Sequence, residues 1–254
     1  MCSKERNMVS SKDIEPSWSY KDQSTWTNYP NFYSVSRTPI NIETSKVAIY
    51  NGYKELNIAY KRNVSGIITS IDENDIPIFF PDNNDNYLYY NNRKYTLINF
   101  HYHNSSENTI NGEYFPVEVH FVNKLSENNI DYYFVLSLLL RIVPIGGLEI
   151  TKNFFTKSEI KKVTYDLSIY NQLSNYKRYD FPGTLTTPPF YENVHWGLYN
   201  TNDINKFQLT INQNDYDEYI HNYINTKANV QCQYQSSRYV NKCTNFLAVK
   251  FINH

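Results

Sequence analysis

Two of the six histidines stand at a spacing that suits metal binding. His101 and His103 lie two positions apart in the segment 99–103, which reads NFHYH. If this segment forms a strand, residues i and i+2 point to the same face, so both imidazoles aim at one point. Imidazole is a preferred ligand of zinc. Two ordinary histidines on the surface or in the core would show the same spacing, so the pair alone leaves both interpretations open.

A second alternating segment, residues 116–122, supplies a third histidine. Glu118, His120 and Val122 share one face of the predicted strand, and a His and a Glu on an otherwise apolar strand need polar partners. Zinc would satisfy the imidazole, and the carboxylate could accept a hydrogen bond from a ring nitrogen that faces away from the metal. The connection back to His103 is short enough for neighbouring antiparallel strands. Three histidines would then converge and leave a fourth tetrahedral position open for water.

A third segment, residues 179–189, is bounded by proline and rich in threonine, and by itself it would be interpreted as an irregular loop. It reads YDFPGTLTTPP and resembles the substrate loop of the alpha-carbonic anhydrases, whose pattern is Tyr/Phe-Pro-Gly-Ser-Leu-Thr-Thr-Pro-Pro. The match continues at the family's spacing to Trp196.

The resemblance extends over roughly residues 18 to 251. Its other segments are Trp18, Tyr20, Trp26, residues 38–42, 99–103, 106–109, 118–120 and 135–140. Three positions depart from the family pattern: Arg37 and Asn99 stand where the family has Gln, and Asn108 where it has His. The loop after His103 is shortened and lacks the family's Trp-Gly.

The resemblance implies a zinc enzyme that hydrates carbon dioxide to bicarbonate, with His101, His103 and His120 as the metal ligands. Asn99 and Glu118 would hold the ligand imidazoles in place. Zinc at such a site lowers the pKa of bound water from about 15.7 to about 7, so hydroxide is available at neutral pH.

By the same resemblance, Thr186 would accept a hydrogen bond from the nucleophile and pass its own proton toward Glu107, which orients the attack on carbon dioxide. The substrate pocket would be lined by Val122, Val135, Leu185, Thr187 and Trp196. Sulfonamides and anions are expected to inhibit.

Fast members of the family export the released proton through a histidine at the cavity rim, and the corresponding segment 70–75 contains none. His195 alternates with Trp196 and should therefore point away from the cavity. Together with His221 and His254, it is interpreted as an ordinary surface histidine.

The elements that must position these residues are mainly strands, because aromatic and β-branched residues recur in short alternating runs. We expect a mainly β (α+β) single domain with a large, mostly antiparallel, twisted central sheet and short peripheral helices. Residues 1–16 are expected to be a flexible arm and 17–254 the alpha-carbonic anhydrase-like domain. The predicted strands are 56–60, 66–71, 77–80, 94–103, 115–123, 132–143, 194–199 and 245–251, and the predicted helices are 157–167 and 213–223.

The composition excludes several other classes of protein. A net charge of −1 over 254 residues gives no electrostatic reason to expect nucleic acid. The longest apolar run, residues 134–140, is far shorter than a membrane span. The charged N-terminal residues are not followed by a signal-peptide core, so we expect a cytoplasmic protein, or a virion protein if the source is viral. We also expect a monomer. Cys232 and Cys243 could pair in an oxidising compartment or remain free thiols in the cytosol.

The main alternative comes from a different class. Some poxvirus surface proteins resemble carbonic anhydrases, have lost zinc ligands and bind glycosaminoglycans. The complete three-histidine set and the absence of net positive charge argue against such an adhesin here.

Overall fold

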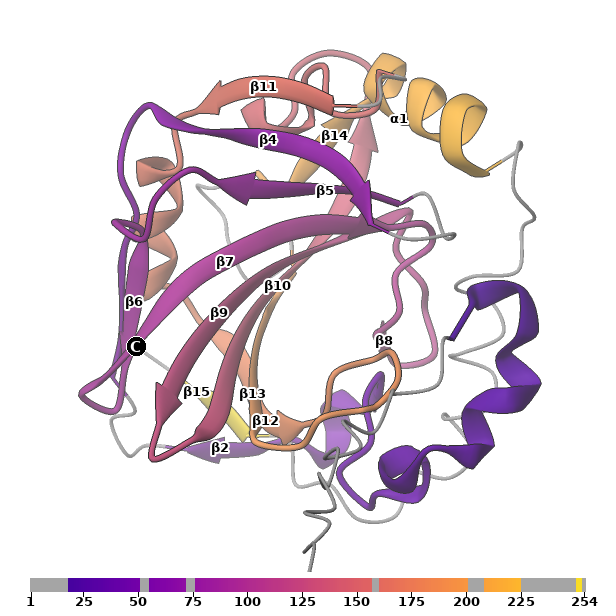
Figure 1. The fold of residues 1–254 in the computed structure, drawn as a ribbon, viewed down its shortest axis with the longest axis vertical. Coiled ribbons are helices and arrows are strands. Elements are labelled where there is room, and N and C mark those ends of the chain that lie inside the picture. The colour runs from indigo at the N-terminus through magenta and orange to yellow at the C-terminus, as the bar shows by residue number, and fades with distance from the viewer. Residues whose placement is uncertain are drawn as a thin grey trace, which may run out of the picture.

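The computed structural model has one large curved sheet at its centre, with short helices around it (Figure 1). It describes residues 18–50, 55–71, 76–156, 160–200, 208–224 and 250–252. The strands of the large sheet are β2 (Ala48–Tyr50), β3 (Leu56–Ala59), β4 (Val64–Ile71), β5 (Ile76–Pro81), β6 (Tyr87–Tyr90), β7 (Arg93–His103), β9 (Val117–Glu127), β10 (Ile130–Val143), β11 (Ile160–Tyr165), β12 (Arg178–Gly183), β13 (Val194–Tyr199), β14 (Thr210–Asn212) and β15 (Lys250–Ile252).

Within the described residues, ten of these thirteen strands join in the order β11-β4-β5-β7-β9-β10-β13-β12-β15-β2. Strand β3 pairs with β6, β6 with β7, and β14 with β10. Pairing is antiparallel except between β10 and β13, β10 and β14, and β15 and β2. Strands β1 (Asn41–Ile42) and β8 (Thr109–Ile110) form a separate parallel pair. The predicted mainly β class, with a large and mostly antiparallel central sheet, is confirmed.

The helices are short and lie at the periphery (Figure 1). They are the 3-10 helices η1 (Tyr20–Asn28), η2 (Pro30–Tyr33), η3 (Thr44–Lys46), η5 (Glu149–Thr151) and η6 (Ser168–Asn175), the α-helix α1 (Gln213–Tyr219) and the π-helix η7 (Ile220–Ile224). The Asn212 side chain caps α1 by accepting a hydrogen bond from the Asn214 backbone N–H at 2.8 Å. The predicted helix 213–223 therefore corresponds to α1 and η7. In the described part of the chain, no helix is long and apolar enough to cross a membrane.

The central strands β7, β9 and β10 have two different faces. Val119, Phe121 and Leu138 point into the main hydrophobic core. Because successive strand residues alternate, His120 and Val135 point to the opposite face. That face carries the polar groups described below, next to a second apolar cluster that includes Trp196, Phe181 and Val135.

A bulge in β7 sets which residues reach the polar face. The register between β7 and β9 shifts between Leu97 and Asn99. In a regular strand these two residues would share a face, yet Leu97 belongs to the main core and Asn99 lies beside His101. The extra residue re-aims the strand, as bulges do near functional sites. Ile98 and Asn99 consequently both face the same cavity.

One predicted element is wrong. The segment 157–167 was expected to be helical, but residues 160–165 form strand β11 at the end of the sheet, paired with β4. Val163 and Tyr165 face inward at a spacing of two, and the ladder to β4 satisfies their backbone groups. Residues 157–159 lie outside the described part.

The eight predicted strands all overlap strands of the sheet, although residues 72–75 and 245–249 are outside the described part. Strands β6 and β12 were not predicted. The first of these covers Tyr87–Tyr90, and the second covers the beginning of the segment that was interpreted as a loop. The predicted arm 1–16, Cys232, Cys243 and His254 also lie outside the described residues.

Candidate metal centre

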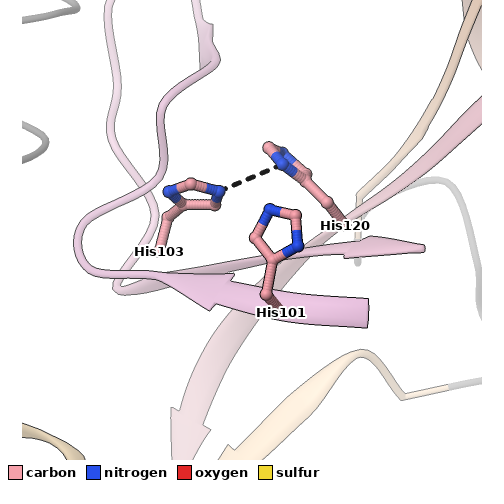
Figure 2. Close-up of side chains that lie close together, drawn as sticks. All are labelled: His101, His103 and His120. Atoms are coloured by element: carbon pink, nitrogen blue, oxygen red, sulfur yellow. Dashed lines mark hydrogen bonds between the residues drawn. The ribbon is translucent and has the colours of Figure 1, made fainter. Parts of the chain in front are cut away.

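Three histidines from two neighbouring strands converge on one point (Figure 2). His101 and His120 are directly opposite each other in the β7–β9 ladder, and His103 is opposite Glu118. One ring nitrogen from each imidazole lies within 4.8 Å of the others. His103 and His120 are buried, and His101 is half-buried. The arrangement predicted from strand alternation is therefore present.

The outer nitrogens of two rings are held by side chains of the same strands. His101 Nδ1 is 3.1 Å from Asn99 Oδ1, and His120 Nε2 is 2.8 Å from Glu118 Oε1. Since an amide oxygen and a carboxylate only accept hydrogen bonds, both imidazoles must carry their proton on this outer nitrogen. Their inner nitrogens, His101 Nε2 and His120 Nδ1, are then left with free lone pairs.

The third ring also faces a carboxylate, but at a longer distance and without a hydrogen bond of normal geometry. His103 Nδ1 is 3.5 Å from Glu107 Oε1, so its Nε2 also points inward, at 3.1 Å from His120 Nδ1. A tetrahedral zinc with bonds of 2.0–2.1 Å separates its nitrogen ligands by about 3.3 Å. Three imidazoles with their lone pairs directed inward thus fit zinc in donor type and in spacing.

Burial favours the neutral form of two of the ligand rings, those of His101 and His103. Desolvation, followed by the neighbouring His120, lowers the pKa of His101 to about 3. The same two causes, with His101 in addition, hold the pKa of His103 well below its ordinary value. A metal binds the neutral imidazole, so at neutral pH the cation does not have to displace protons from these rings.

Glu118 is a fully buried carboxylate with a complete set of donors. Its Oε2 accepts from the backbone N–H groups of Glu107 and Asn108 at 2.7 and 2.8 Å. Its Oε1 accepts from Asn108 Nδ2, Ser137 Oγ and His120 Nε2 at 2.7, 2.6 and 2.8 Å. Burial alone would raise the pKa of this carboxyl, but His120, Ser137 and Asn108 outweigh burial and lower it. Glu118 is therefore ionised and fixed, and it fixes His120.

Glu107 has a different environment. It is 1% exposed, and neither carboxylate oxygen has a hydrogen-bond partner of normal geometry. Desolvation raises the pKa of Glu107 to about 7, with Glu118 adding to the rise, while His120, the Thr186 hydroxyl and Arg37 lower it. A cation among the histidines would lower it further. Both oxygens of this buried carboxylate are thus available to accept hydrogen bonds.

The loop that follows β12 brings Thr186 to the site. Gly183 ends the strand where no side chain fits: an added Cβ would lie 2.5 Å from Thr38 and 2.7 Å from Trp196. Next to it, the Thr184 carbonyl accepts hydrogen bonds from the Thr38 hydroxyl and from Trp196 Nε1, the latter at 3.1 Å. These contacts direct the chain over the histidines, where Thr186 lines the same cavity.

The cavity above the histidines has a volume of about 300 Å³. All five predicted pocket residues line it, together with Thr186, Asn99 and the three histidines. The prediction missed five further lining residues: Trp18, Ile76, Ile78, Ile98 and Tyr133. Alternation in β5 offered a signal, because Ile76 and Ile78 share a face while Phe79 is buried in the core.

Asn108, noted above as a departure from the family pattern, has a specific role. Its Nδ2 donates to Glu118, and its Oδ1 accepts from the Ile40 backbone N–H at 2.9 Å. An amide donates and accepts at once, so one side chain ties the N-terminal segment to the carboxylate behind the metal ligands. Ser137, a further side-chain donor to Glu118, was not predicted.

His195 points away from the cavity, as expected, but its interpretation as a surface histidine is wrong. Its side chain is 20% exposed, and its ring stacks on Tyr90. His195 Nε2 bonds to Asp180 and lies 2.8 Å from the Tyr90 hydroxyl. Asp180 also binds buried Arg178, at 3.1 Å. His221 is exposed, as predicted.

Comparison with known proteins agrees with this geometry. Residues 21–242 match the model of the eukaryotic-type carbonic anhydrase family. A carbonic anhydrase of Neisseria gonorrhoeae is 31% identical over 160 residues, which cover 57% of this chain and 58% of that protein. A carbonic anhydrase of Pectobacterium carotovorum is 27% identical over 196 residues, covering 70% and 74%.

Solved structures show the same fold. The Photobacterium profundum alpha-carbonic anhydrase superposes with a TM-score of 0.65 at 18% identity, covering 91% of this chain and 96% of that one. Dioscorin complexed with ascorbate superposes with the same TM-score and identity, covering 82% and 87%. At this identity the likeness concerns the fold alone.

Proposed function

This chain belongs to the eukaryotic-type carbonic anhydrase family, with an intact three-histidine site for zinc, and on that premise we propose that it catalyses the reversible hydration of carbon dioxide to bicarbonate and a proton. The observation that carries the proposal is the set of inward-facing nitrogens on His101, His103 and His120, each ring having an oxygen acceptor on its outer side. When bound, zinc supplies a water whose pKa is about 7.

We further propose that Thr186 and Glu107 orient the nucleophile. The Thr186 hydroxyl has one proton to donate, and ionised Glu107 can only accept. If that proton is directed at Glu107, the hydroxyl oxygen must accept from the nucleophile, which leaves the nucleophile's lone pair directed at the substrate. The burial of Glu107 without another partner supports this assignment.

The substrate would lie against the apolar wall of the cavity. Val122, Val135, Leu185 and Trp196 come from four different segments and meet there. The side chains of Val122, Val135 and Leu185 carry no hydrogen-bonding group, and the indole of Trp196 already donates to the Thr184 carbonyl. An apolar wall suits an uncharged, linear molecule such as carbon dioxide.

The test is zinc analysis of the purified chain together with a carbon dioxide hydration assay. We expect about one zinc per chain and catalysis that benzenesulfonamide inhibits, because its deprotonated nitrogen can occupy the fourth position and donate to Thr186. A chain that takes up no zinc even on reconstitution, and that does not hydrate carbon dioxide, would contradict the proposal and favour the glycosaminoglycan-binding alternative.

Proton export is expected to limit turnover. Among the described residues that line the cavity, the titratable side chains are the three histidines and Tyr133. Burial raises the pKa of Tyr133 above its ordinary value, which makes it a poor carrier at neutral pH. Imidazole buffer, with a pKa near 7, should therefore raise kcat by about 10-fold, less than the roughly 10²- to 10⁴-fold of a positioned acid or base because the buffer is free in solution.

The same titration should leave kcat/KM for carbon dioxide unchanged, because that ratio excludes the later proton step. A buffer of similar pKa that is too bulky for a cavity of about 300 Å³ is the matched control and should have little effect. A kcat that is high without imidazole and insensitive to it would mean that another group exports the proton.

A further inference from the structure

Arg37 is a buried cation that the proposed mechanism does not use. Its side chain lies in the interior, with the residue 2% exposed. Burying a charged group is unfavourable unless its contacts compensate for the lost hydration. The groups that it contacts therefore indicate which part of the structure the guanidinium stabilises.

The guanidinium contacts the loop of residues 184–190 on both sides of Thr186. Its Nη1 donates to the Leu185 carbonyl at 3.2 Å and lies 3.4 Å from Thr184 Oγ1. Its central carbon lies 3.2 Å from the centroid of the Phe190 ring. Leu185 immediately precedes Thr186, and Phe190 follows it by four residues. A single side chain thus braces the loop before and after the residue proposed to orient the nucleophile.

The Phe190 contact holds a backbone conformation that the sequence does not favour. Phe190 has φ of 61°, in the left-handed region that bulky residues rarely adopt. It is fully buried, and its N–H donates to the Thr187 carbonyl at 2.9 Å. Its ring packs edge-on against three aromatic residues, Trp26, Tyr29 and Phe32. Arg37 stacks on the ring as well, and so helps to keep the loop in this turn.

We propose that Arg37 is a positioning residue, which fixes the Thr186 hydroxyl between Glu107 and the metal position by holding Leu185 and Phe190. The inference rests on the proposed role of Thr186. Arginine suits the task because a planar guanidinium can donate hydrogen bonds in its plane and stack through its face. Lysine and glutamine cannot do both.

A double-mutant cycle tests the proposal with the zinc-loaded full chain. Arg37→Gln should lower kcat/KM for carbon dioxide by about 10-fold, since a small displacement of a reacting group has an effect of this order. Thr186→Ala should lower it by about 10²-fold. In the double variant the loss should stay within about twofold of Thr186→Ala alone, because Arg37 then has no hydroxyl to position.

The outcomes are distinguishable. Full activity of Thr186→Ala would contradict the proposed role of Thr186 and, with it, the role of Arg37, whereas the proposed function itself fails only if the wild-type chain does not hydrate carbon dioxide. A slow Thr186→Ala combined with a fully active Arg37→Gln would overturn the Arg37 proposal alone. So would a double variant whose loss is the product of the two single losses, about 10³-fold, because independent sites contribute independently.

Ligand affinities give a readout that does not depend on how much protein folds. Benzenesulfonamide can donate its N–H to Thr186, whereas azide has no hydrogen to donate. In Arg37→Gln the Kd of benzenesulfonamide should rise by about fivefold, the value of one weakened hydrogen bond, with the Kd of azide changing by less than about twofold. Arg37→Lys, which keeps the charge and should be better tolerated, is expected to show the same selective loss. Equal changes for both ligands would indicate a merely structural role.

Discussion

Replacing His101 by alanine is expected to abolish carbon dioxide hydration together with zinc binding. The remaining inward nitrogens, on His103 and His120, provide two ligands where a stable zinc site needs three or four from the protein. Without the metal the pKa of water returns to about 15.7, so hydroxide is no longer available at neutral pH. We expect a loss of at least about 10³-fold in kcat/KM and far less than one zinc per chain, measured by metal analysis and stopped-flow hydration.

His101 is the best of the three ligands for this test because it is half-buried, while the other two lie deeper. His221→Ala is the matched control. It removes the same imidazole from an exposed position in η7 and should leave zinc content and activity unchanged. Full zinc occupancy and full activity in His101→Ala would mean that the metal binds elsewhere.

The zinc should also stabilise the fold. A ligand that binds only the folded chain stabilises it by about 4 kcal/mol at 1,000 times its Kd. Chelation should accordingly lower the Tm of the wild-type chain and of His221→Ala, and it should leave the Tm of His101→Ala almost unchanged.

Strand alternation predicted that the three histidines converge on one face, and the family resemblance identified them as metal ligands. His101 and His103 are two residues apart on one strand, and the connection to His120 is short enough for the antiparallel neighbour that the structure shows. The bulge between Leu97 and Asn99 was not predictable from the same pattern, because alternation alone places Leu97 on the same face as Asn99. The prediction for Asn99 came from the family resemblance, and its contact with His101 depends on that bulge.

The segment 157–167 shows why one element was predicted wrongly. Ile160, Val163 and Leu167 repeat at three and four residues, which suits a helix, while Val163 and Tyr165 alternate, which suits a strand. The segment forms a strand because its backbone groups pair with the edge of β4. In the resulting strand Ile160 is exposed, so tertiary pairing outweighs the helical pattern.

Strand β12 was not predicted because its composition does not favour a strand. A proline and a glycine inside Arg178–Gly183 favour a loop, since proline cannot donate to a ladder. Residues Tyr179 to Gly183 nevertheless pair with β13, and Pro182 lies opposite His195. Pairing with β13 therefore outweighs the local preference for a loop. Long-range contacts of this kind, like those of Arg37 with the loop, cannot be read from local sequence.

Thr186→Ala is expected to keep its zinc and to lose about 10²-fold in kcat/KM. Thr186 is not one of the three histidines that form the metal site, so the site should remain intact. The substitution removes one oriented hydrogen bond from the transition state, a change that typically lowers the rate by about 10²- to 10³-fold. Zinc content by metal analysis and initial rates of hydration at neutral pH would measure the two effects separately.

Two neighbouring substitutions make the result specific to this hydroxyl. Thr187→Ala removes the same atoms one residue along the loop, from a side chain that lines the same cavity, and it should change kcat/KM by no more than a few-fold. Thr186→Ser keeps a hydroxyl that can still donate to Glu107, so it should retain most of the activity. If Thr187→Ala lost as much activity as Thr186→Ala, the loop would act through its shape alone. Full activity in Thr186→Ala would show that the nucleophile is oriented without this hydroxyl. If the hydroxyl directs the attacking lone pair, its removal must slow the step in which that lone pair forms the new bond.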